Sequence, residues 1–178
     1  MKTKSMPTPQ IQLLESPDWE DYELLDSGTG ARLERYGSYL FNRPEHQAVW
    51  QPALPPARWK AAHATFEPAR EESGGRWKFH QPVSPSWVMQ YKGLKFQAQA
   101  TNSRHLGVFP EQAAHWDWIG ERIRQAQQPV RVLNLFGYTG LATLAAAQAG
   151  ASVTHVDASK KAIAWARQNQ ELSGLSDR

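Results

Sequence analysis

One strand-like run that enters a glycine turn constrains the fold of this chain more than any other feature. Residues 130–135 form a short, mostly apolar run, residues 136–140 (Phe-Gly-Tyr-Thr-Gly) form the turn, and an alanine-rich helical pattern follows. A second short run, residues 152–156, ends at Asp157. This order predicts the first half of a nucleotide-binding βαβ unit. Gly137 and Asp157 stand about 20 residues apart, the separation usual in such units.

The turn favours a ligand that carries a ribose but no pyrophosphate. A dinucleotide fingerprint reads G-x-G-x-x-G, whereas this turn has two glycines, Gly137 and Gly140, beside the bulky Phe136 and Tyr138. It also lacks the Lys-Ser/Thr ending of a phosphate-binding P-loop. The glycines let the backbone approach a ligand, and Asp157 can accept hydrogen bonds from ribose hydroxyls. S-adenosylmethionine fits this description.

The same residues resemble class I S-adenosylmethionine-dependent methyltransferases. The loop Asn-Leu-Phe-Gly-Tyr-Thr-Gly at 134–140, the Val-Asp-Ala-Ser at 156–159 and the helical residues 162–169 look like motifs I and II of that family. The upstream His-Leu-Gly-Val-Phe-Pro-Glu-Gln at 105–112, with Trp116, resembles the ribosomal RNA large-subunit methyltransferases. The resemblance runs from about residue 102 to about residue 172. It implies S-adenosylmethionine as the cofactor and RNA as the substrate.

The resemblance also implies roles for single residues. Backbone groups of Phe136, Gly137 and Gly140 would face the methionine part of the cofactor, and Tyr138 or Phe136 would pack on it. Asp157 would accept both ribose hydroxyls. The family more often has an acid where Asn134 stands, and an amide cannot offer the same charge pairing. The full set of expected cofactor-binding residues is Phe109, Gln112, Asn134, Phe136, Gly137, Tyr138, Gly140, Asp157 and Ala158, the last of which would lie under the adenine.

Each candidate also has a plainer structural interpretation. The loop 134–140 suits any strand-to-helix turn, and Asp157 suits an acid that complements the dipole of the following helix, although Ser159 is better placed as its cap. Phe109 suits a hydrophobic staple against the next helix. His105 is a weak candidate for a general base, because a lone histidine is more often a packed or surface residue. Catalytic residues stay unassigned, since the family's Asp-Pro-Pro motif does not occur in this sequence.

Composition limits the class of protein. The chain has 178 residues, of which 40% are apolar and 21% charged, as in soluble globular proteins of one domain or slightly more. Without cysteine it has no disulfide, no cysteine metal site and no cysteine nucleophile, and we expect no bound metal. No apolar run reaches the ~20 residues of a membrane helix, and the polar N-terminus is no signal peptide. We therefore expect a cytoplasmic protein that does not contact membranes.

Hydrophobic patterns divide the chain into three parts. We expect a disordered tail at 1–20, a β-rich module at 21–101 and the start of a Rossmann-like S-adenosylmethionine-binding domain at 102–178. The proline-rich segment 44–56 predicts an irregular connection, and 71–75 a second loop. The expected elements are hairpins 22–25/31–36 and 87–91/94–100, a strand near 39–41, a helix at 111–127, a buried strand at 130–135, a helix at 141–149, a strand at 152–156 and a helix from the Ser159 cap to 173.

The predicted fold class is α/β (α+β overall), with an N-terminal β-rich module before the first βαβα part of a Rossmann-like methyltransferase domain. Two parallel strands with two helices cannot complete such a layer, so we expect the front part of a larger enzyme, inactive by itself. The expected function is methyl transfer from S-adenosylmethionine to RNA, and the methyl acceptor and oligomeric state stay open.

Two rival functions also stay open. The first is a non-catalytic nucleic-acid-binding module with a remnant Rossmann half. Basic and aromatic residues interleave between 32 and 79, and the formal net charge is +3, but solvated charges around a small β-core explain the same pattern. The second rival, a nicotinamide oxidoreductase, is weakened by the absent G-x-G-x-x-G.

Overall fold

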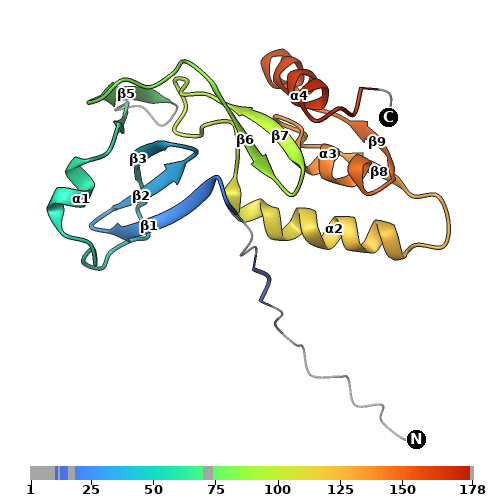
Figure 1. The fold of residues 1–178 in the computed structure, drawn as a ribbon, viewed down its shortest axis with the longest axis horizontal. Helices are drawn as coiled ribbons and strands as arrows, with labels where there is room; N and C mark the ends of the chain where they lie inside the picture. Colours follow the sequence, from blue (N-terminus) through green and yellow to red (C-terminus); the bar gives the residue numbers. More distant parts are fainter. Residues whose placement is uncertain (1–10, 12, 16–18, 70–73, 177–178) are drawn as a thin grey trace, which may run out of the picture.

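The computed structural model describes residues 11, 13–15, 19–69 and 74–176 as a mixed α/β fold (Figure 1). Its N-terminal part contains a five-stranded sheet in the order β1-β2-β3-β4-β5, antiparallel except for the parallel pair β3–β4. A short helix, α1, lies between β3 and β4. The bounds are β1 (Tyr22–Gly28), β2 (Ala31–Tyr36), β3 (Tyr39–Pro44), α1 (Pro56–Lys60), β4 (Ala64–Pro68) and β5 (Gly75–Phe79).

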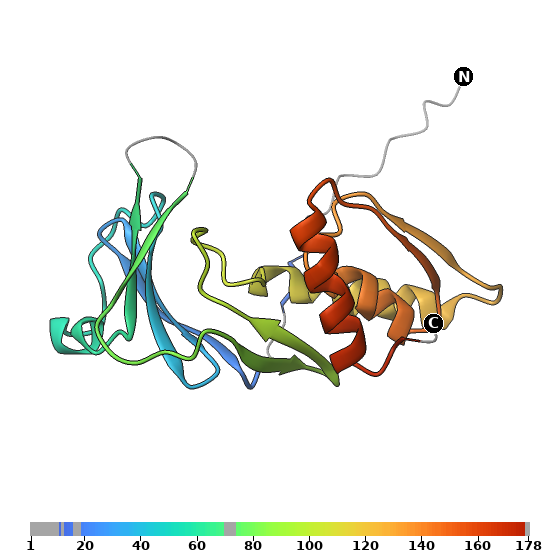
Figure 2. The ribbon, with the colours of Figure 1, turned by 90° about the horizontal axis from the view of Figure 1, so that it is seen from above.

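The later elements form a hairpin followed by strand and helix in alternation. In the last sheet β8 and β9 pair in parallel, so that Asn134 and His155 are neighbours where both strands end. Figure 2 shows the five-stranded sheet at one end of the molecule and the β8–β9 pair with its helices at the other. The bounds are β6 (Trp87–Tyr91), β7 (Leu94–Ala98), a 3-10 turn η1 (Pro110–Gln112), α2 (Ala113–Gln125), β8 (Arg131–Asn134), α3 (Leu141–Gln148), β9 (Ser152–His155) and α4 (Lys160–Leu172).

Both predicted hairpins are present, and the first has a tighter turn than expected. Strand β1 continues to Gly28 rather than ending at 25. The register shifts between Leu24 and Asp26, a bulge that turns the Asp26 carboxylate toward the proline-rich segment. There it accepts the N–H groups of Ala53 (3.2 Å) and Leu54 (2.8 Å), which keeps this segment against the sheet.

Three elements were not predicted from the sequence: α1, β4 and β5. Helix α1 starts inside the segment expected to be irregular, with a proline in its first turn, where a missing N–H costs nothing. Strand β4 alternates buried Ala64 and Phe66 with less buried neighbours and pairs with β5. Part of the predicted loop 71–75 lies outside the described residues, and Gly75 is the first residue of β5.

Trp19 corrects the expected tail at residues 1–20. Its ring lies 4.5 Å from that of Tyr91, and its indole N–H donates to the Pro110 carbonyl (3.3 Å). Burying an aromatic side chain stabilises the fold, so Trp19 belongs to the folded part of the chain. Most of the remaining tail, residues 1–10, 12 and 16–18, lies outside the described residues.

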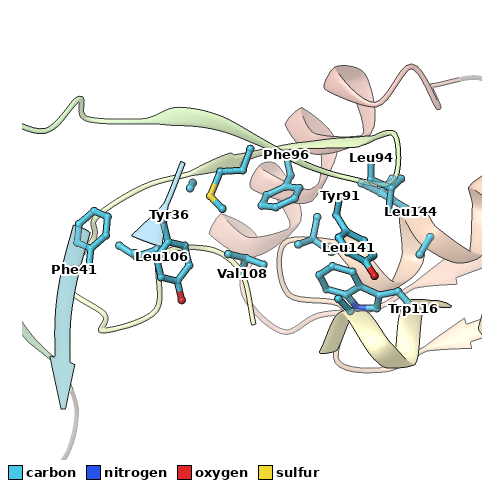
Figure 3. Close-up of a cluster of buried hydrophobic side chains, with 14 of the residues drawn as sticks. Tyr36, Phe41, Tyr91, Leu94, Phe96, Leu106, Val108, Trp116, Leu141 and Leu144 are labelled. Carbon is cyan, nitrogen blue, oxygen red and sulfur yellow. The ribbon is translucent and has the colours of Figure 1, made fainter. Parts of the chain in front are cut away.

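The hydrophobic core runs without a break across residue 101, the expected domain boundary (Figure 3). It extends from Tyr36 and Phe41 of the five-stranded sheet through Phe96 of β7 to Leu141 of α3. The β6–β7 hairpin, counted with the N-terminal module in the sequence, packs on α3 and α4. The division of the chain into two domains therefore stays a prediction.

The expectation of a buried strand at 130–135 is wrong for one face of the strand. On one face of the β8–β9 pair, Val132 and Val153 pack against Ile123 of α2 and Ala146 of α3. On the other face Leu133 is 60% exposed. Within the described residues, helices pack on one face of these two strands. Among the described residues, no helix is both long and apolar enough to cross a membrane.

Candidate functional site

The loop 134–140 continues the β8–β9 pairing and then turns sharply into α3. The Val156 N–H donates to the Asn134 carbonyl (2.9 Å), and the Gly137 N–H donates to the Val156 carbonyl (3.0 Å). The Gly140 N–H donates to the Gly137 carbonyl (2.8 Å) and closes the turn. Gly140 has a φ of 91°, and Tyr138 has a φ of 46°, which is uncommon for a residue with a side chain.

Asp157 holds Tyr138 in this conformation. One carboxylate oxygen accepts the Tyr138 N–H (2.8 Å) and the other accepts the Ser159 N–H (2.8 Å). These two hydrogen bonds hold the pKa of Asp157 below its usual range, so the carboxylate is charged at neutral pH. The predicted cap of α4 is confirmed, because the Ser159 hydroxyl accepts the Ala162 N–H (3.2 Å). Asp157 thus ties the loop to the start of α4 and is not the cap.

Gly137 is required for a reason that the sequence did not suggest. Its φ is not in the left-handed region. A Cβ atom at Gly137 would overlap the imidazole ring of His155, which lies directly beside it. The close approach that the structure shows here is to the protein's own histidine, and the approach to a ligand stays a prediction.

Asn134 stabilises the loop through side-chain hydrogen bonds. Its side-chain oxygen accepts the Phe136 N–H (3.3 Å), and its amide donates to the Thr143 hydroxyl oxygen (3.0 Å). That hydroxyl lies 2.9 Å from Nδ1 of His155, so its proton can point to this nitrogen. Burial lowers the pKa of His155 and favours the neutral ring. Sequence reasoning missed Thr143 and His155, because nothing local pairs residues twelve positions apart.

A cavity of about 290 Å³ brings several predicted residues together. It lies between the loop 136–139, the start of α3, the first turns of α2 and the end of a linker segment, which we define as residues 102–109. Phe136 is 91% exposed at this cavity. The lining residues are Val108, Phe109, Gln112, Trp116, Phe136, Gly137, Tyr138, Thr139, Leu141 and Ala142.

Four predicted residues do not line this cavity. The Asn134 side chain is hydrogen-bonded to Phe136 and Thr143, and Gly140 lines a second cavity between α3 and α4. Asp157 is one hydrogen bond away, through Tyr138, and the adjacent Ala158 is exposed. The candidate site therefore combines a largely apolar cavity lined by Tyr138 with a charged acid that is hydrogen-bonded to the Tyr138 backbone.

The linker segment is attached to the loop through Thr139, which the sequence did not single out. The Thr139 hydroxyl donates to the Gly107 carbonyl (2.6 Å), and the Thr139 carbonyl accepts the side-chain amide of Asn169 (2.8 Å). The rings of Phe109 and Tyr138 lie 5.4 Å apart. These contacts place the linker segment as one wall of the cavity.

His105 packs on this wall but does not line the cavity. Its ring centroid lies 4.5 Å from that of Phe109. Burial, and then the nearby charges of Arg43 and Arg104, lower the pKa of His105 to about 4. The ring is therefore neutral at pH 7.

Comparisons with known proteins agree with the sequence resemblance. A scan of protein-family models finds no match. The ribosomal RNA large subunit methyltransferase K/L of Stutzerimonas stutzeri is 33% identical over 129 residues, 71% of this chain but 17% of that protein. The protein of the same name from Magnetococcus marinus is 42% identical over 85 residues, 47% of this chain and 11% of that protein. The chain thus spans a small part of these relatives.

Solved structures extend the likeness to almost the whole chain. The SAM-dependent methyltransferase from Agrobacterium tumefaciens matches with a TM-score of 0.87 and 46% identity, over 99% of this chain and 56% of that one. SMU.776, provisionally described as a methyltransferase and solved with SAH, matches with a TM-score of 0.62 at 18% identity, which shows the fold alone. This chain is related to the S-adenosylmethionine-dependent methyltransferases, and among them to ribosomal RNA large subunit methyltransferase K/L.

Proposed function

We propose that this chain forms the cofactor-binding part of an S-adenosylmethionine-dependent RNA methyltransferase, the first βαβα part of a Rossmann-like domain. The observation that carries the proposal is the Tyr138–Asp157 hydrogen bond, which places a charged carboxylate beside an aromatic-lined cavity. S-adenosylmethionine has a matching division, with a ribose diol next to a methionine part. When bound, it supplies a methyl group activated by the positively charged sulfur.

The residues present suit the two ends of this cofactor. Asp157 remains ionised, and each of its oxygens can accept a further hydrogen bond from a ribose hydroxyl. Ala158 leaves room for the adenine beside it. Phe109 and Tyr138 offer aromatic surface to the methionine part, and the exposed Phe136 shields it from water. The chemical role of these groups is positioning, which by itself accelerates reactions between bound partners.

RNA is the proposed substrate class. The curated relatives are by name ribosomal RNA methyltransferases, and the net charge of +3 is compatible with a polyanion. The whole enzyme's activity belongs to the same proposal, since the chain covers only part of these relatives. The nicotinamide alternative has no support in the loop, whose turn lacks the third glycine.

Calorimetric titration tests the proposal. We expect this chain to bind S-adenosylhomocysteine and not to bind NAD⁺, with a 1:1 stoichiometry. A non-catalytic RNA-binding module would instead bind an RNA oligonucleotide and neither small ligand. A folded chain that shows no heat and no thermal shift with S-adenosylhomocysteine contradicts the proposed function.

A further inference from the structure

Three successive carbonyls of the linker segment accept hydrogen bonds from the five-stranded sheet. The Asn102 carbonyl accepts the Gly75 N–H (3.1 Å). The Ser103 carbonyl accepts the indole N–H of Trp77 (3.2 Å). The next carbonyl, that of Arg104, accepts Nη1–H of Arg43 (3.0 Å). All three donors belong to β3 or β5, so one end of the linker segment is attached to the N-terminal sheet.

Arg43 is fixed by a buried ion pair. Its guanidinium donates from Nε (2.6 Å) and Nη2 (2.7 Å) to the two carboxylate oxygens of Glu34, and the two side chains are 1% and 0% exposed. Glu34 also accepts the hydroxyls of Tyr22 (3.0 Å) and Tyr36 (3.3 Å). A planar guanidinium held at two nitrogens cannot swing, so its third nitrogen points to the Arg104 carbonyl in one direction only.

The other end of the linker segment is attached to the candidate site. The Gly107 carbonyl accepts the hydrogen bond from the Thr139 hydroxyl. Gly107 has a φ of 93° and lies so close to the Trp165 ring that a Cβ atom there would overlap the ring. Two residues later, Phe109 forms part of the cavity wall. Between the two attachments the segment has only a few residues, so a shift at Arg104 is transmitted to Gly107 and Phe109.

We propose that Arg43 and Trp77 are positioning residues for the cofactor site, acting through the linker segment without lining the cavity. The inference rests on the proposed function. It means that the N-terminal sheet does more than fill the core: it sets the distance between the wall at Phe109 and the loop at Tyr138. Loss of either donor lets the wall move, and cofactor affinity falls although no cofactor contact is removed.

The test compares Trp77→Phe and Arg43→Lys with Trp50→Phe as the matched control. Trp77→Phe removes one indole hydrogen bond and keeps an aromatic ring, and Arg43→Lys keeps the positive charge facing Glu34. In the control, Trp50 loses an equivalent indole bond to the Ser27 carbonyl (2.8 Å), which lies in the same sheet but not on the linker segment. All proteins are the full chain, studied at a temperature where each is folded.

Two readouts separate positioning from simple destabilisation. We expect Trp77→Phe and Arg43→Lys to weaken S-adenosylhomocysteine binding about 2- to 13-fold, the effect of one net hydrogen bond, and to speed hydrogen exchange in peptides covering 102–109. Trp50→Phe should change neither. If the parent chain binds the ligand and both test variants bind it equally well, the inference is wrong while the proposed function stands. If the parent does not bind, the proposed function fails and the inference fails with it.

Discussion

We expect Asn169 to contribute strongly to the stability of the fold. It is 0% exposed, and its side chain joins two segments far apart in the sequence. The side-chain oxygen accepts the Gln97 N–H of β7 (2.8 Å), and the amide donates to the Thr139 carbonyl of the loop 134–140 (2.8 Å). Asn169→Ala leaves both backbone groups without partners.

The magnitude follows from those two groups. A buried polar group left unpaired costs about 1–3 kcal/mol, so Asn169→Ala should lower the free energy of unfolding by about 2–6 kcal/mol. Urea denaturation followed by tryptophan fluorescence measures it. The control is Gln125→Ala, whose exposed side-chain amide donates to the Glu121 carboxylate, and a change within about 0.5 kcal/mol is expected.

Asn169→Asp keeps the measurement informative if the alanine variant fails to fold. The aspartate still accepts the Gln97 N–H, but it opposes the Thr139 carbonyl unless it is protonated and can donate. Its pKa in the folded state is therefore raised, and stability should fall as pH rises through that value. A cost below about 1 kcal/mol for Asn169→Ala, together with no pH effect for Asn169→Asp, would refute the bridging role.

Two further predictions concern histidines. The pKa of His105 is lowered to about 4, so below about pH 6.5 the unfolded chain binds a proton that the folded chain does not, and the free energy of unfolding should decline from pH 6.5 to 4. In thermal melts at several pH values, His105→Asn should remove this part of the decline. An unchanged slope would contradict the burial of the ring. Gly137→Ala should cost about 1–3 kcal/mol through overlap with the His155 ring, and adding His155→Ala should recover part of that loss; strictly additive costs would contradict the contact.

Elements held together by local contacts could be predicted from the sequence. The hairpin at Lys92-Gly93, helices α3 and α4 and the Ser159 cap each follow from turn glycines, apolar periodicity or a capping residue within a few positions. Strands β4 and β5 were missed because they are stabilised by pairing within a sheet that the sequence did not reveal. The burial of β8 was overestimated, since its apolar pattern does not say which faces are covered.

The candidate site divides in the same way. The loop 134–140 and Asp157 are recognisable because glycine spacing and an acid after a strand are local signals. Thr139, Thr143 and Asn169 act through hydrogen bonds to residues that are distant in the sequence, and a lone threonine or asparagine carries no sign of such a partner. The contact of Gly137 with His155 was missed for the same cause, because His155 lies on the next strand.

The most direct test of the account asks whether Asp157 binds the ribose. Calorimetry should compare the parent chain, Asp157→Ala and the exposed control Glu171→Ala, each with S-adenosylhomocysteine and with its 2′,3′-dideoxy analogue. We predict that Asp157→Ala weakens S-adenosylhomocysteine binding about 10- to 1000-fold. Binding of the analogue should weaken by a smaller factor, because only the Tyr138 hydrogen bond is lost, and Glu171→Ala should affect neither ligand. An equal loss for both ligands would mean that Asp157 only holds Tyr138 in place, and no loss for either would contradict the proposed cofactor site.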